Sequence, residues 1–275
     1  MADTIKTKEV ADFIVEWLTD YAKSARVNGY VIGVSGGIDS AVVSTLCAKT
    51  GLNVIVMEMP IHQAKDQVSR SRNHIDTLKQ RYNNVKSIEL DLTETYDDFV
   101  RALENVADLN ADIDQKFLTL SNTRSRMRMI SLYSVAGLHG YLVCGTGNKV
   151  EDFGVGFYTK YGDGGVDLSP IADLMKSEVY ALGKEIGVNN DILTARPTDG
   201  LWDDGRTDED QIGATYDELE WAMLTQEKYG NEPVDSIFDN DRQKEVWEIY
   251  LSRHKANKHK MDPIPVCIIP EELRS

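Results

Sequence analysis

The sequence Tyr30-Val31-Ile32-Gly33-Val34-Ser35-Gly36-Gly37-Ile38-Asp39-Ser40 passes from a short apolar segment into a loop of glycines and serines. β-Branched residues dominate 30–34, which predicts a buried strand, and residues 38–49 predict a helix that ends at Gly51. The loop therefore stands at a helix N-terminus, where unpaired N–H groups and the helix dipole favour an anion. The paired glycines allow close approach to a phosphate, and the Asp39 carboxylate is a ligand type that suits Mg²⁺.

A purely structural explanation of this loop is a tight strand-to-helix turn with a serine cap. The chain lacks the Gly-Lys-Ser/Thr of a Walker loop, and Val150 stands where a dinucleotide fingerprint starting at Gly145-Thr146-Gly147 would have its third glycine. Kinase-type and Rossmann dehydrogenase functions are therefore disfavoured. Taken alone, the loop favours a phosphate site only slightly over a structural turn.

The alternation of strands and helices continues along the chain. Further strands are expected at 54–57, 85–90 and 141–144, and helices at 5–25, 64–81, 98–138, 176–186 and 216–253. Because each strand is apolar on both faces, we predict one α/β domain over residues 1–275, a three-layer, Rossmann-like parallel sheet with helices on both faces. We also expect a mobile loop at 198–213 and an extended strap against the core at 263–270.

Composition narrows the classes of function. The 275 residues carry a formal net charge of −15, which argues against a nucleic-acid partner. No stretch approaches the roughly 18 apolar residues of a membrane helix, and the N-terminus has no signal pattern. Cys47, Cys144 and Cys267 are odd in number and widely spaced, so we expect core thiols in a reducing cytoplasm.

Three further stretches identify a family. Ser-Gly-Gly-x-Asp-Ser after a strand resembles the loop of the ATP pyrophosphatase superfamily, which has an adenine nucleotide alpha hydrolase-like fold. The segment at 157–170, Phe-Tyr-Thr-Lys-Tyr-Gly-Asp-Gly-Gly-Val-Asp-Leu-Ser-Pro, resembles the signature of NAD synthetases and is far more specific. The segments at 122–137 and 145–151 also resemble that family. The chain is thus identified as a member of the ammonia-dependent NAD synthetases.

This resemblance implies a ligase that forms a carbon–nitrogen bond in the last step of NAD biosynthesis. The nicotinate carboxylate of deamido-NAD would attack ATP to give an adenylate and pyrophosphate, and ammonia would then displace AMP. The resemblance also implies Mg²⁺ and a homodimer that shares the deamido-NAD site. The chain has no room for a glutaminase domain, so free ammonia is the expected nitrogen source.

The resemblance also assigns residues to roles. Asp39 and Glu151 would bind magnesium, Lys176 would counter charge on the departing pyrophosphate, and Asp163 is our candidate for accepting a proton from ammonium. The ATP-binding set is Gly33, Val34, Ser35, Gly36, Gly37, Ile38, Asp39, Ser40, Thr146, Lys176 and Thr198. The deamido-NAD-binding set is Arg126, Lys160, Asp167, His259 and Lys260.

Some alternatives stay open at this point. His254-Lys255 offers a second His-Lys pair, one extra residue lies between Glu151 and Lys160 relative to bacterial members, and Gly147-Asn148 replaces an Asp-His found in some of them. Rival functions are the ATP-cleaving part of a GMP synthetase, a tRNA thiolase and a non-catalytic nucleotide-binding module. An acidic chain without paired cysteines disfavours the thiolase.

Overall fold

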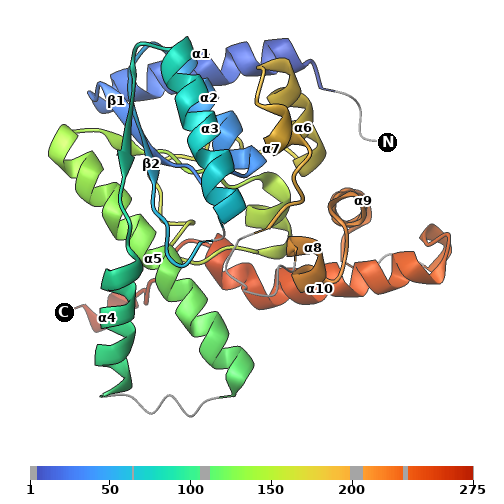
Figure 1. The fold of residues 1–275 in the computed structure, drawn as a ribbon. Helices are drawn as coiled ribbons and strands as arrows, with labels where there is room; N and C mark the ends of the chain where they lie inside the picture. The colour runs from blue at the N-terminus through green and yellow to red at the C-terminus, as the bar shows by residue number, and fades with distance from the viewer. Residues whose placement is uncertain (1–4, 64, 106–111, 199–206, 232–234, 275) are drawn as a thin grey trace.

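Four parallel strands form the centre of the molecule (Figure 1). The computed structural model describes residues 5–63, 65–105, 112–198, 207–231 and 235–274. The strands are β1 (Gly29–Gly33), β2 (Asn53–Glu58), β3 (Val85–Glu89) and β4 (Leu142–Val143), in the order β3-β2-β1-β4. Tyr30 of β1 lies opposite Val54 on one side and Leu142 on the other. The expected parallel sheet is confirmed.

Helices surround this sheet. They are α1 (Thr7–Ala25), α2 (Ile38–Lys49), α3 (Lys65–Arg81), α4 (Thr93–Glu104), α5 (Ile113–His139), α6 (Lys176–Glu185), α7 (Asn190–Leu193), α8 (Asp208–Ile212), α9 (Tyr216–Tyr229) and α10 (Asp241–Met261). A π-helix covers Val150–Val155, and short 3-10 helices cover Asp235–Ile237 and Glu271–Leu273. Among the described residues, no helix is long and apolar enough to cross a bilayer.

Strand residues alternate between two cores. Tyr30, Ile32 and Val56 face one layer, which packs against α1, α2, α3 and α6. Val31 and Ile55 face the opposite layer, which α4 and α5 provide. Side chains of successive strand residues point to opposite faces, so a strand that is apolar throughout must be covered on both sides. The three-layer arrangement is therefore confirmed.

A third core lies beside the sheet domain and joins the π-helix to α9 and α10. Leu219, Tyr250 and Val150 are fully buried in it. Figure 1 shows α10 as a long helix below the sheet, with α9 near one end. This unit contributes side chains to the site described below.

Strand order locates the ligand-binding edge. The chain runs outward from β1 to β2 and β3 through α2 and α3, and then returns through α4 and α5 to place β4 on the other side of β1. The connections after β1 and β4 therefore diverge, which opens a crevice at the carboxyl ends of these neighbouring strands. The loop at 35–40 follows β1, and the loop at 144–149 follows β4.

Two of the expected helices are each split in two. The stretch 98–138 contains the end of α4 and most of α5, which are separate helices, and 216–253 contains α9 and the first part of α10. Periodicity registers apolar spacing but not a change in helix direction, so one continuous pattern hid two helices.

Three expectations about exposure are wrong. The mobile loop expected at 198–213 contains the helix α8, in which Asp208 and Ile212 are buried. Residues 199–206 of that loop lie outside the described part of the chain. The end at 263–270 has no regular structure, as expected, but its side chains are exposed instead of packing on the core. Cys267 is exposed as well, whereas Cys47 and Cys144 are buried.

Candidate active site

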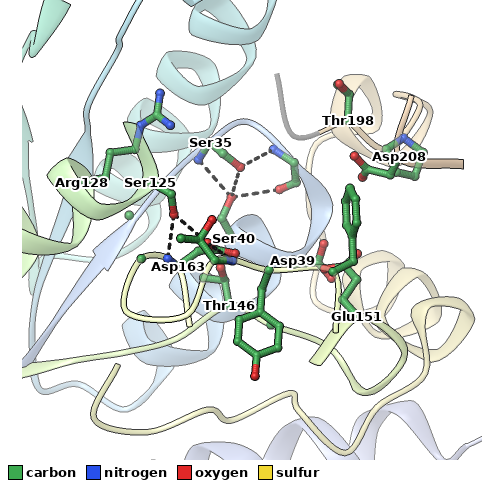
Figure 2. Close-up of a pocket in the computed structure, with 18 of the residues that line it drawn as sticks. Ser35, Asp39, Ser40, Ser125, Arg128, Thr146, Glu151, Asp163, Thr198 and Asp208 are labelled. Carbon is green, nitrogen blue, oxygen red and sulfur yellow. Dashed lines mark hydrogen bonds between the residues drawn. The ribbon is translucent and has the colours of Figure 1, made fainter. Parts of the chain in front are cut away.

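A cavity of about 730 Å³ opens at the carboxyl edge of β1 and β4. Its volume falls in the range of small-molecule and cofactor sites. Fourteen of the predicted site residues line it: Gly33, Val34, Ser35, Gly36, Gly37, Ile38, Asp39, Ser40, Thr146, Glu151, Asp163, Lys176, Thr198 and Lys260. Figure 2 shows residues of the loop at 35–40, of α5 and of the segment after β4 converging on this space.

The loop at 35–40 is closed by its own serines. The Ser40 hydroxyl accepts a hydrogen bond from the Ser35 N–H at 3.2 Å and donates to the Gly37 carbonyl at 3.1 Å. Gly36 has a positive φ of 83°, and a Cβ there would lie 2.8 Å from the carbonyl oxygen of Gln67. Glycine is thus required at this position both by backbone conformation and by the close approach of α3.

Lys176 lies between the two predicted magnesium ligands. Its Nζ is 2.6 Å from Asp39 Oδ2 and 2.9 Å from Glu151 Oε1, and its side chain is only 4% exposed. Asp39 comes from the first turn of α2, Glu151 from the π-helix and Lys176 from the start of α6. We call these three residues the carboxylate–lysine cluster.

Burial and the charges of the neighbouring groups act in opposite directions on the pKa values of this cluster. Burial disfavours the Lys176 ammonium, but both carboxylates outweigh this effect, so the pKa of Lys176 is raised. Burial raises the pKa of Asp39, and Lys176 opposes the rise. Burial would also raise the pKa of Glu151, but Lys176 and a hydrogen bond from Tyr216 lower it below its usual value. A buried cation thus faces two carboxylates, an arrangement that costs much stability when one partner is removed.

Two residues outside the predicted set hold the carboxylates in place. The Tyr216 hydroxyl, from α9, donates to Glu151 Oε1 at 2.5 Å. The Asn148 side-chain amide donates to Asp39 Oδ1 at 3.1 Å, and its oxygen accepts from the Glu151 N–H at 3.1 Å. Tyr216 gave no local signal in the sequence. Asn148 lies within the stretch 145–151 that resembles the family, at a position where some members have histidine.

A π-helix over Val150–Val155 carries Glu151 and its neighbour Asp152. A π-turn contains one residue more than an α-turn, and such turns often lie at functional sites. Here the longer turn sends the two neighbouring carboxylates in different directions, because Glu151 meets Lys176 whereas Asp152 packs against Gly147. Burial, followed by repulsion from Glu151, raises the pKa of Asp152 to about 8. Asp152 was not among the predicted residues, although it lines the cavity.

Asp163 faces the cavity from the glycine-rich segment, residues 157–170. Its Oδ1 accepts hydrogen bonds from Ser125 Oγ at 2.6 Å and from the Thr159 N–H at 3.0 Å. Desolvation within the cavity raises the pKa of Asp163, and the Ser125 and backbone hydrogen bonds oppose it. Figure 2 shows Asp163 beside Ser125 of α5 and on the same side of the pocket as Thr146.

Lys260 fastens the glycine-rich segment to α10. Its Nζ donates to the carbonyl oxygens of Gly156 and Tyr158, both at 2.8 Å, and burial lowers its pKa. Lys260 lines the cavity, whereas Lys255 of the alternative His-Lys pair is exposed and His254 contacts the Gly154 carbonyl.

Three other predicted residues lie together at the surface, outside the cavity lining. Arg126 donates to the Lys160 carbonyl at 3.3 Å, and Lys160 Nζ donates to the His259 carbonyl at 2.6 Å. We call Arg126, Lys160 and His259 the surface chain. Asp167 also lies outside the lining, because its carboxylate accepts hydrogen bonds from Tyr133 at 3.1 Å and from the Val143 N–H at 2.8 Å.

The donor set at the phosphate end suits Mg²⁺. Among the described residues, no group of three or more His, Cys, Asp or Glu side chains is arranged to hold a metal. Mg²⁺ commonly takes only one or two carboxylates and completes its shell with water and substrate phosphates. Asp39 and Glu151, on either side of one ammonium at the cavity wall, fit that pattern.

Comparison with known proteins agrees with this geometry. Residues 10–263 match the NAD synthase family model. The NH(3)-dependent NAD(+) synthetase of Mesoplasma florum is 35% identical over 271 residues, 98% of this chain and 99% of that protein. The corresponding protein of Mycoplasma genitalium is 36% identical over 88% of this chain and 90% of its own length.

Solved structures show the same fold. NMN synthetase from Francisella tularensis is 30% identical, with a TM-score of 0.79 over 97% of this chain and 99% of that one. NH3-dependent NAD synthetase from Campylobacter jejuni, at 24% identity, shares the fold with a TM-score of 0.74 over 96% of this chain and all of the other. With the family model, the sequence relatives and the fold in agreement, the chain belongs to the NAD synthase family.

Proposed function

We propose that the protein amidates deamido-NAD with ammonia, consuming ATP and releasing AMP and pyrophosphate. The observation that carries this proposal is the carboxylate–lysine cluster beside the loop at 35–40. The loop would bind the phosphates of ATP, and the charged groups next to it would stabilise pyrophosphate as it leaves. Family membership supports the identity of the amide acceptor. A non-catalytic module would have no use for a buried ammonium held between two carboxylates.

The reaction needs activation of a carboxylate. An oxygen of the nicotinate carboxylate attacks the α-phosphorus of ATP, and the bond to the β-phosphate oxygen breaks to release pyrophosphate. Ammonia then attacks the acyl carbon, AMP leaves, and one proton is lost from nitrogen. The protein positions the reactants in the cavity, and Lys176 stabilises negative charge on the leaving pyrophosphate.

Asp39 and Glu151 would hold Mg²⁺ in this reaction. When bound there, the ion would supply positive charge to the phosphate oxygens. Asp163 would accept the proton from ammonium. Its position on the cavity wall supports this role, and burial raises its pKa above that of an ordinary aspartate, which makes its carboxylate a stronger base.

We also propose a homodimer. Apolar side chains are exposed along α5, where Ile113, Leu118, Ile130 and Leu138 are 57–84% exposed, and along the C-terminal segment at Ile264, Val266, Ile268 and Leu273. Exposed apolar surface on this scale supports a protein interface. A second copy beside α5 would also explain why Arg126 lies outside the cavity of its own chain. Sedimentation at micromolar concentration should give twice the mass of 30.8 kDa, and a monomer would contradict the proposal.

One assay tests the activity. Purified protein receives ATP, MgCl₂, deamido-NAD and either ammonium or glutamine, and NAD and AMP are measured. We expect equal amounts of both products with ammonium and little with glutamine. Xanthosine monophosphate in place of deamido-NAD tests the GMP synthetase alternative. Failure to form NAD with ammonium, while ATP still binds, would reject the proposal.

A second candidate is amidation of the mononucleotide instead of the dinucleotide. The likeness to the Francisella tularensis NMN synthetase, over nearly the full length of both chains, favours testing it. The same assay with nicotinic acid mononucleotide should give a lower kcat/KM than deamido-NAD. The opposite order would replace the dinucleotide by the mononucleotide as the preferred acceptor.

A further inference from the structure

Asn148 is completely buried beneath the cavity and does not line it. Its side chain contacts two groups that come from distant parts of the sequence: the Asp39 carboxylate on α2 and the backbone of Glu151 on the π-helix. Its backbone carbonyl also accepts from the Asp152 N–H at 2.9 Å. One residue thus touches both elements that carry the predicted magnesium ligands.

The chemistry of the partners fixes the orientation of this amide. A backbone N–H can only donate, so the Asn148 oxygen must face Glu151. An ionised carboxylate can only accept, so the Asn148 nitrogen must face Asp39. Both distances are 3.1 Å, and rotating the amide by 180° would place like groups against each other at both ends.

Each of these two bonds constrains one carboxylate. The bond to the Glu151 N–H has the i to i+3 relation of a helix N-cap and fixes the start of the π-helix. The bond to Asp39 Oδ1 holds that oxygen away from Lys176, so that Oδ2 faces the ammonium. Lys176 attracts both carboxylates but cannot itself fix their relative orientation, because its ammonium is nearly isotropic, whereas a planar amide is directional.

We propose that Asn148 is a positioning residue that sets the geometry of Asp39 and Glu151 toward the metal-bound phosphates of ATP. This inference rests on the proposed function only in taking metal-bound ATP as a ligand of the cavity. It does not depend on which carboxylate is amidated. Residues that orient the ligands of a metal commonly change metal affinity or activity 10–100-fold when replaced.

The two bonds can be separated by substitution. Asn148→Ser keeps a cap acceptor for the Glu151 N–H but is too short to reach Asp39. Asn148→Asp keeps the size and the cap but places an acceptor against Asp39. Asn240→Ser is a matched control, because Asn240 Oδ1 caps α10 through the Gln243 N–H at 3.0 Å, far from both carboxylates in sequence.

Calorimetry of ATP binding tests the proposal in MgCl₂ and again in EDTA. With magnesium we expect the affinity of Asn148→Ser for ATP to fall about 10–100-fold, whereas in EDTA the loss should stay below about threefold. Asn240→Ser should bind as the unaltered protein does in both buffers. The melting temperature of each variant is recorded alongside, and Asn148→Asp provides the same comparison if Asn148→Ser does not fold.

Two results would overturn the proposal: ATP affinity within twofold of the unaltered protein in magnesium, or an equal loss in both buffers, which would mark Asn148 as merely structural. The proposed function is judged separately, by NAD formation in the unaltered protein. If that protein binds magnesium-ATP but forms no NAD, the amidation proposal fails and the role of Asn148 is still decided by the calorimetry.

Discussion

The carboxylate–lysine cluster and the surface chain are the two ends of the predicted site, and they are built in opposite ways. In the cluster, Lys176 is 4% exposed and contacts two carboxylates from other elements. In the surface chain, Arg126 is exposed, and the contacts of Arg126 and Lys160 are to backbone carbonyls. At the phosphate end, one ammonium therefore faces two carboxylates of the same chain, which leaves an excess of negative charge. At the other end, the positive charges have no anionic partner among these contacts.

This difference suggests how the two ends should respond to change. A buried ion cluster is coupled to folding, because removal of one member leaves charges without compensation. Exposed cations that touch carbonyls contribute little to stability and are available to an anionic substrate. Substitutions at the phosphate end should therefore lower both the stability of the protein and the rate of the reaction. Substitutions at the other end should lower only the affinity for substrate.

The largest effect is expected for Lys176→Met. Two carboxylates would remain close together in a poorly hydrated site, so the free energy of unfolding should fall by about 3–5 kcal/mol. The rate of adenylate formation should fall at least about 100-fold, because charge on pyrophosphate is no longer stabilised. Urea denaturation and pyrophosphate release measure the two effects. Lys184→Met, an exposed position on the same helix, is the control, and a Lys176→Met protein within 1 kcal/mol of it would contradict the comparison.

Asp163→Asn should leave the phosphate end intact and affect the second step. Asparagine can still accept from Ser125, but it cannot take a proton from ammonium, so amidation of a preformed adenylate should slow about 10²–10⁴-fold. Adenylate formation should change much less. Rapid-quench kinetics separates the steps, with Asp173→Asn, a fully exposed aspartate, as the control. Equal slowing of both steps would remove Asp163 from this role.

The interior behind the phosphate loop should also be sensitive to acid. His74 is buried with Nε2 2.9 Å from Ser44 Oγ, and burial lowers its pKa from 6.5 to about 4. The unfolded chain binds a proton below pH 6.5 and the folded protein does not, so the contribution of His74 to stability should be lost as the pH drops from about 6.5 towards 4. At about 1.4 kcal/mol per pKa unit, the total is about 3 kcal/mol.

His74→Gln removes this titration while it keeps a donor for Ser44. Between pH 7 and pH 4.5, the free energy of unfolding of the unaltered protein should therefore fall relative to that of His74→Gln. Identical slopes would show that other groups, and not His74, govern the loss of stability in acid.

The smallest effect on folding is expected at the surface chain. Lys160→Ala should raise the KM for deamido-NAD about tenfold and leave the free energy of unfolding within about 1 kcal/mol, because the side chain is only partly buried. The KM for ATP should not change. The control is Lys255→Ala, which changes an exposed lysine of the alternative His-Lys pair. An equal rise in the KM for deamido-NAD and the KM for ATP in Lys160→Ala would contradict the proposed difference between the two ends.

The same two ends explain what the sequence could predict. Strand residues such as Val31 and Ile55 are apolar because both sheet faces are covered, so the sheet follows from local pattern. The loop at 35–40 was recognisable because its glycines and serines are consecutive in the chain. Its meeting with Glu151 and Lys176 followed from the resemblance to a family and from the common edge of parallel strands.

Other features could not be predicted because they depend on tertiary contact. The Tyr216 hydroxyl donates to Glu151, which is 65 residues away in the sequence. Residue spacing alone cannot predict a hydrogen bond between such distant positions. Asn148 resembles an ordinary polar loop residue until its burial between two elements is known. The exposed C-terminal segment was expected on the core because its apolar composition does not reveal which surface covers it.

Pyrophosphate exchange into ATP tests most directly the claim that the cluster serves adenylate formation. The unaltered protein is supplied with ATP, magnesium and labelled pyrophosphate, without ammonium, in the presence or absence of deamido-NAD. We expect exchange that requires deamido-NAD and that is lost in Lys176→Met but kept in Asp163→Asn. Exchange without deamido-NAD, or none in a protein that forms NAD once ammonium is added, would contradict it.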